Sequence, residues 1–73
     1  MSDEHHDQIC RSLYYLVNNE KVAMLSDGNY KELQATCATA RKHADQGNYE
    51  EARRLLAFAR DFLDEESKNP GFE

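Results

Sequence analysis

Two consecutive segments of this chain carry apolar residues at the alternating three- and four-residue spacing of a buried helix face. The first segment has Tyr30, Leu33, Cys37, Ala40 and Ala44, and the second has Tyr49, Ala52, Leu56, Ala59 and Leu63. A glycine at position 47 separates them, and glycine readily adopts the left-handed conformation that ends a helix. The sequence therefore predicts that the two segments fold back on each other as an antiparallel helical hairpin.

Folding the chain at Gly47 sets small side chains against large ones at most levels of this hairpin. The expected pairs are Ala44 with Tyr49, Ala40 with Ala52, Cys37 with Leu56, Leu33 with Ala59, and Tyr30 with Leu63. Such complementarity is what dense packing requires. At the level of Ala40 and Ala52, both side chains are small, so we expect the two backbones to approach closely there.

Few residues interrupt the helical pattern, because the 73 residues contain one proline and three glycines. Gly28-Asn29-Tyr30 repeats as Gly47-Asn48-Tyr49, and each copy predicts a turn in which glycine ends one helix and asparagine caps the next. Ser2, followed by two acids, predicts the start of an earlier helix. Helices are thus expected at residues 3–25, 30–45 and 49–66.

No window of the sequence alternates with the period of two that strands show, and helix-forming residues dominate its middle and end. The expected fold class is all-α: an antiparallel helical hairpin plus an N-terminal helix, forming a small three-helix bundle. Residues 1–66 form one domain and residues 67–73 a flexible tail. Glu20 interrupts the apolar line of the first helix, which leaves a bend near Asn18 open.

The third expected helix has more apolar surface than one seam uses. Leu55, Phe58 and Phe62 form a second stripe beside the first. Two explanations are open. The stripe is covered by the first helix through its apolar residues Ile9, Leu13, Leu16 and Val17, or it is the contact surface for a protein partner or a second copy of the chain.

Charge and length exclude several classes of function. Nine basic and fourteen acidic side chains give a net charge of -5, which disfavours direct binding to nucleic acid. No apolar run is long enough to span a membrane, and the acidic N-terminus does not resemble a secretion signal, so we expect a cytoplasmic protein. A chain of this length buries a marginal core, which favours association with another protein.

The residues that could carry chemistry are better explained as structural. His5, His6 and Cys10 are close in sequence but lack the four ligands of a structural zinc site, and we interpret the histidines as solvated. Cys37 occupies a seam position, where burial suppresses the reactive thiolate. We therefore expect no catalytic residues, no metal, no cofactor and no enzymatic activity.

The segment from Thr36 to Leu63 resembles one tetratricopeptide repeat, a hairpin of two antiparallel helices. The matching residues are Ala40, Gly47, Tyr49, Ala52, Leu56 and Ala59, and the departures are Thr36, Thr39, His43 and Asp64, where the family prefers Trp, Leu, Tyr and Pro. The resemblance covers less than half of the chain. It implies a scaffold that binds protein segments, without catalysis.

These observations predict a small acidic helical module for protein–protein interaction, acting as an adaptor, chaperone or co-chaperone subunit through Leu55, Phe58 and Phe62. In general character the chain is similar to bacterial secretion chaperones. The alternative is a regulator of a basic DNA-binding protein or enzyme. It rests on the acidic ends of the chain, since residues 1–7 carry three acids and residues 61–73 carry five.

Overall fold

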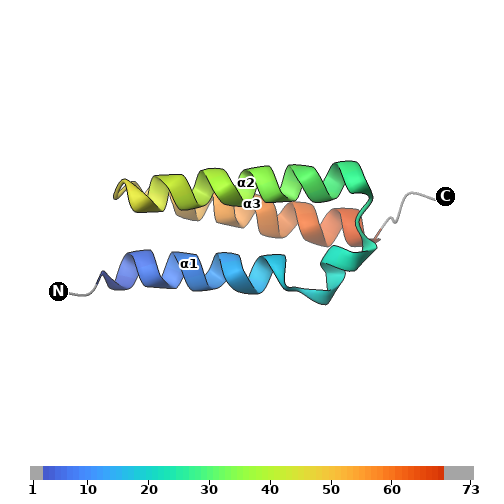
Figure 1. The fold of residues 1–73 in the computed structure, drawn as a ribbon, viewed down its shortest axis with the longest axis horizontal. Coiled ribbons are helices and arrows are strands. Elements are labelled where there is room, and N and C mark those ends of the chain that lie inside the picture. The colour runs from blue at the N-terminus through green and yellow to red at the C-terminus, as the bar shows by residue number, and fades with distance from the viewer. Residues whose placement is uncertain (1–2, 69–73) are drawn as a thin grey trace.

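Three α-helices and one short 3-10 helix make up residues 3–68, the part of the chain that this computed structural model describes. They are α1 (Glu4–Val17), the 3-10 helix η1 (Glu20–Met24), α2 (Asp27–Asp45) and α3 (Tyr49–Lys68). Figure 1 shows the three long helices running alongside one another, and α1 contacts both α2 and α3. The all-α three-helix architecture predicted from the sequence is confirmed.

The corner between α2 and α3 forms as expected around Gly47. Its φ of 84° lies in the left-handed region, where a residue with a Cβ atom is strained. The amide of Asn48 donates to the carbonyl of His43 at 2.8 Å, and the amide of Gly47 donates to that of Ala44 at 3.1 Å. This pair of bonds is the Schellman arrangement, which satisfies the last carbonyls of α2 while turning the chain back.

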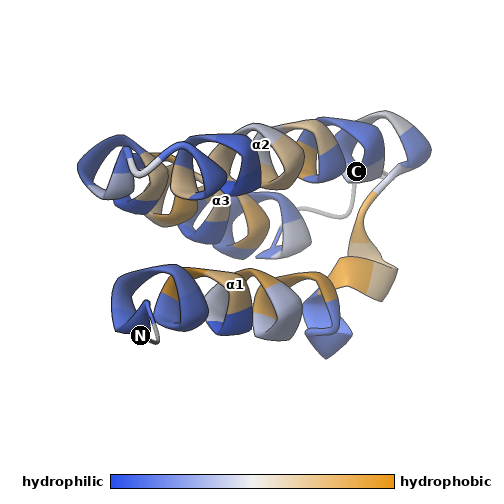
Figure 2. Cartoon of the chain, turned by 60° about the vertical axis from the view of Figure 1, so that its left-hand side comes forward, coloured by the Kyte–Doolittle hydropathy of each residue, from blue (hydrophilic) through white to orange (hydrophobic). Residues whose placement is uncertain are grey.

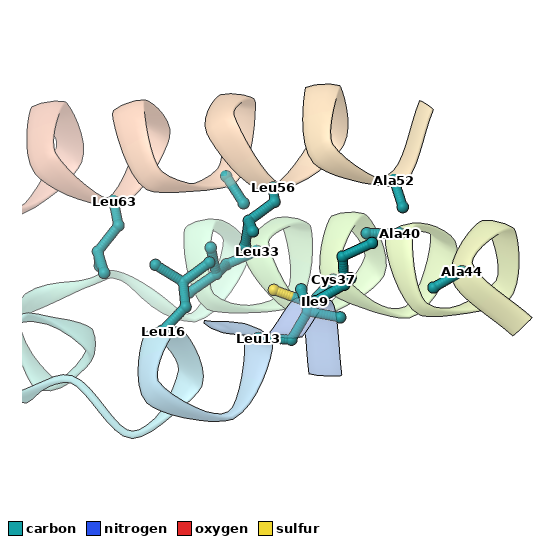
Figure 3. Packing of buried hydrophobic residues seen from close by; sticks show 11 residues of the cluster. Ile9, Leu13, Leu16, Leu33, Cys37, Ala40, Ala44, Ala52, Leu56 and Leu63 are labelled. Atoms are coloured by element: carbon teal, nitrogen blue, oxygen red, sulfur yellow. The ribbon is translucent and has the colours of Figure 1, made fainter. Parts of the chain in front are cut away.

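The hairpin seam forms the core of the molecule. Its buried residues on α2 and α3 are joined by three from α1, and the full set is Ile9, Leu13, Leu16, Leu33, Cys37, Ala40, Ala44, Ala52, Leu56, Ala59 and Leu63. Ala40 and Ala52 have no exposed surface, and Figure 3 shows them on the facing sides of the two helices. Tyr30 departs from the predicted seam, because 41% of its surface is exposed at the start of α2.

The first expected helix, over residues 3–25, is broken where the sequence left a bend open. Asn18 ends α1, and its side-chain amide donates to the carbonyl of Tyr14 at 2.8 Å. Asn19 then caps η1 by accepting from the amide of Lys21 at 2.8 Å. Two consecutive asparagines favour such a break because their side chains compete for backbone hydrogen bonds. Figure 2 shows hydrophobic residues in the connection that leads from α1 into α2, and Val22 and Leu25 pack against the core.

The predicted boundary of the second helix was wrong. Ser26 is the N-cap of α2 and accepts from the amide of Asn29 at 3.3 Å, so Gly28 and Asn29 lie inside the first turn. Gly28 has no positive φ, and the two glycine repeats therefore have different roles. Similarly, α1 is capped by Asp3, whose carboxylate accepts from the amide of His6.

At the other end of the chain, α3 continues through Ser67 and Lys68, two residues that the sequence predicted to belong to the tail. The rest of the expected tail, residues 69–73, lies outside the described residues, as does Ser2. Within residues 3–68, no helix is long and apolar enough to cross a membrane.

Candidate docking face

The stripe of Leu55, Phe58 and Phe62 lies along one side of α3 and is only partly covered. Leu55 and Phe62 are half-buried and pack against the core, whereas 54% of the Phe58 surface is exposed. The Phe58 and Phe62 rings stack with centroids 6.3 Å apart and planes inclined by 26°. The two rings therefore form a continuous aromatic surface, and the outer side of this surface is exposed to solvent.

The first helix does not cover this stripe, contrary to one of the two explanations left open by the sequence. From the α1 side of the molecule, His5 contacts Arg53 at 2.8 Å and Lys21 of η1 contacts Asp64 at 2.7 Å. Helical geometry, at about 100° per residue, places Arg53 and Asp64 roughly half a turn around α3 from Leu55 and Phe62. Thus α1 and η1 lie on the opposite flank of α3.

One edge of the stripe, on the side away from α1, is bordered by α2. Asn29, Thr36 and His43 are spaced seven residues apart on this helix, and all three are half-buried. The side-chain amide of Asn29 donates to Glu66 at 2.9 Å, so this edge of α2 meets the stripe side of α3. The α2–α3 face, defined here as these three residues with Leu55, Phe58 and Phe62, is therefore the side of the hairpin turned away from α1.

One polar atom of this face is left without a partner. His43 Nδ1 is buried and makes no hydrogen bond to any residue that the structure describes. A buried polar atom without a partner is energetically unfavourable. The face thus combines an exposed aromatic surface with an unsatisfied ring nitrogen at its α2 border.

The histidines at the start of α1 are accessible to solvent, as expected from the sequence, but both also contact the hairpin. His6 Nε2 lies 2.6 Å from an oxygen of Asp45 at the end of α2, and the His5 ring stacks on Tyr49 at 5.4 Å. The Tyr49 hydroxyl donates to Asp3, and this bond lowers the pKa of the Asp3 carboxyl and raises the pKa of Tyr49. Together these contacts fasten the start of α1 to the hairpin corner.

The sequence carried no signal for these contacts, because their partners are 39 and 48 residues apart and no periodicity links them. The short spacing of His6 and Cys10 instead places Sγ of Cys10 3.7 Å from His6 Nε2. Over residues 3–68, no three His, Cys, Asp or Glu side chains are grouped in a way that could hold a metal ion.

Both cysteines are free and line a groove of about 270 Å³ between α1 and α2. Cys37 is buried, as its seam position predicted, and the loss of solvent raises the pKa of its thiol. A raised pKa reduces the thiolate fraction, which is the nucleophilic form. Cys10 is half-buried and is the more accessible of the two.

Part of the acidic surface expected to meet a basic partner is engaged within the chain. Asp64 contacts Lys21 at 2.7 Å and Lys68 at 3.6 Å, and the hydrogen bond from Lys21 is the main cause of its lowered pKa. Arg54 pairs with Glu51 at 3.5 Å, three residues away. Lys21, Arg60 and Asp64 also line an open pocket of about 510 Å³ between α1, η1 and α3, on the flank away from the stripe.

Comparison with known proteins identified no similar protein: no protein-family model, curated protein or solved structure matches this chain. The resemblance of residues 36–63 to a tetratricopeptide repeat therefore stays a prediction. Its hairpin geometry is present, since Ala40 and Ala52 meet at the crossing and Gly47 forms the turn.

Proposed function

We propose that this protein is a non-enzymatic helical interaction module that binds a protein partner through the α2–α3 face, as an adaptor, chaperone or co-chaperone subunit in the cytoplasm. The observation that carries the proposal is the exposure of Phe58, stacked on Phe62, on the flank that α1 leaves open. Unlike tyrosine, phenylalanine has no polar group to meet water, and an exposed phenylalanine within a larger apolar patch is typical of binding sites.

The chain offers an internal contrast that tests the proposal. Phe58 and Tyr15 are both large, exposed aromatic residues, with 54% and 70% of their surfaces accessible, but Tyr15 lies on α1. Phe58→Ser should keep the protein folded, because 54% of the Phe58 surface is exposed and the residue lies outside the buried core. The same variant should lose a bound partner, whereas Tyr15→Ser should keep it.

The measurement is the native mass of the complex isolated from the protein's own cell extract, which reports partner and copy number together. A complex that survives Phe58→Ser contradicts the proposal, as does a wild-type chain found only as the free monomer. Unfolding of the Phe58→Ser variant would also contradict the proposal, because Phe58 would then belong to the core.

A regulatory role through the acidic ends of the chain is the alternative function. It predicts binding that weakens steeply with salt, whereas apolar docking persists. The pairing of Asp64 with Lys21 and Lys68 reduces the charge available for such a role, so we favour docking on the α2–α3 face.

A further inference from the structure

The apolar stripe on the α2–α3 face is bordered by carboxylates. Along α3, Glu51 lies one turn before Leu55, Glu66 lies one turn after Phe62, and Glu65 lies two turns after Phe58. Glu51 and Glu66 are half-buried at this border, and Glu65 is exposed. Three acids thus follow the length of the stripe.

Bases are scarce on the same side of the hairpin. Arg54 lies one turn before Phe58, and its guanidinium pairs with Glu51 at 3.5 Å. The basic residues of α2 are elsewhere: helical geometry places Lys31, Arg41 and Lys42 more than a quarter turn away from the border that Thr36 and His43 form. The α2–α3 face is therefore apolar in its centre and acidic at its edge.

A second copy of the chain is a poor occupant for such a face. If two α3 helices met antiparallel across Phe58, Glu51 of one copy would lie opposite Glu65 of the other. Like charges facing one another across an interface are unfavourable. The net charge of -5 on each chain opposes such pairing further.

We propose that the α2–α3 face receives an amphipathic helix of another protein, with an apolar ridge that packs on Phe58 and Phe62 and with Lys or Arg on both flanks of that ridge. This assignment rests on the docking function proposed above and specifies the chemistry of the partner. The basic side chains pair with Glu65, and with Glu51 and Glu66 in addition to the contacts that these two acids already make with Arg54 and Asn29. The apolar ridge excludes water from the two rings.

Two synthetic helical peptides test this assignment. Both carry the same Leu and Phe stripe, and they differ only in whether Lys or Glu flanks it. Fluorescence anisotropy of the labelled peptides, titrated with the full chain at low ionic strength, measures both affinities. We expect the Lys-flanked peptide to bind at least about tenfold more tightly than the Glu-flanked one, and the difference to shrink with added salt.

Variants of the protein distinguish the effect of charge on this face from the effect of the net charge of the chain. The triple substitution Glu51→Gln, Glu65→Gln and Glu66→Gln should remove most of the preference for the Lys-flanked peptide, since glutamine keeps the size of the side chain. The control triple, Glu4→Gln, Asp7→Asn and Glu20→Gln, makes the same change in net charge on α1 and η1 and should keep the preference.

The outcomes separate this assignment from the proposed function. Equal binding of both peptides, lost in Phe58→Ser, supports the docking face and overturns the basic partner. Equal effects of the two triple variants overturn it as well, because net charge alone would then explain the preference. Binding of neither peptide contradicts the docking function together with the assignment. Sedimentation as a dimer that dissociates in Phe58→Ser assigns the face to a second copy and overturns the basic helix.

Discussion

The crossing of α2 and α3 leaves no room for a larger side chain at position 52. Ala52 and Ala40 are both fully buried, with 0% of their surfaces exposed, where the two helices face each other. Replacing Ala52 by Leu adds three carbon atoms at this level, so the helices must separate or the new side chain must leave its preferred rotamer. Overpacking of this kind costs about 1–3 kcal/mol of unfolding free energy.

Thermal and urea unfolding followed by circular dichroism measure this effect. For a domain of this size each kcal/mol lowers the melting temperature by roughly 4–8 °C, so Ala52→Leu should lower it by at least about 4 °C. Ala57→Leu is the matched control, because Ala57 is exposed on the same helix and leucine is nearly as good a helix former as alanine. Coinciding unfolding curves for the two variants would refute the close packing argued for this crossing.

Three further perturbations test other parts of the structure. Leu33→Ala, which truncates one of the two largest fully buried side chains, should cost about 2–5 kcal/mol in urea unfolding, and a loss below about 1 kcal/mol would contradict its place in the core. Iodoacetamide should label Cys10 faster than Cys37 in the folded protein, because burial raises the pKa of the Cys37 thiol, and equal labelling rates in the folded protein would contradict that burial. The contact with Lys21 lowers the pKa of Asp64 below its unfolded value of 3.8, so this contact stabilises the fold above that pH and its contribution is lost as pH falls through the folded pKa. Lys21→Gln should therefore be less stable than the wild type near neutral pH and equally stable in strong acid, and a stability difference independent of pH would contradict the contact.

The hairpin could be predicted from the sequence because its determinants are local and periodic. The seam positions recur every three or four residues, and Gly47 is the residue that the left-handed turn requires, with a φ of 84°. The start of α2 could not be predicted in the same way, since two capping signals compete there. Ser26 accepts from the amide of Asn29 and starts the helix three residues before the position that the glycine repeat indicated.

The position of α1 against the hairpin could not be predicted from the sequence, because its polar contacts join residues that are far apart in the chain. His6 meets Asp45, and Lys21 meets Asp64, across 39 and 43 residues. Neither pair shows a pattern in the chain, and His5 and His6 look like the polar start of any helix. The stripe residues could be named from the sequence, whereas the side of α3 on which α1 packs could not.

The α2–α3 face stays exposed because of the number of apolar stripes that each helix carries. α1 has a single buried line, Ile9, Leu13 and Leu16, and this line is already used against the core. α3 has the seam line and, beside it, the stripe, so its apolar arc exceeds what two neighbouring helices cover. If α1 packed over the stripe, Phe58 would be buried, but the contacts of Lys21 and His5 with the other flank of α3 would be broken. In the observed arrangement the contacts of His5 and Lys21 are kept, and the aromatic surface stays exposed.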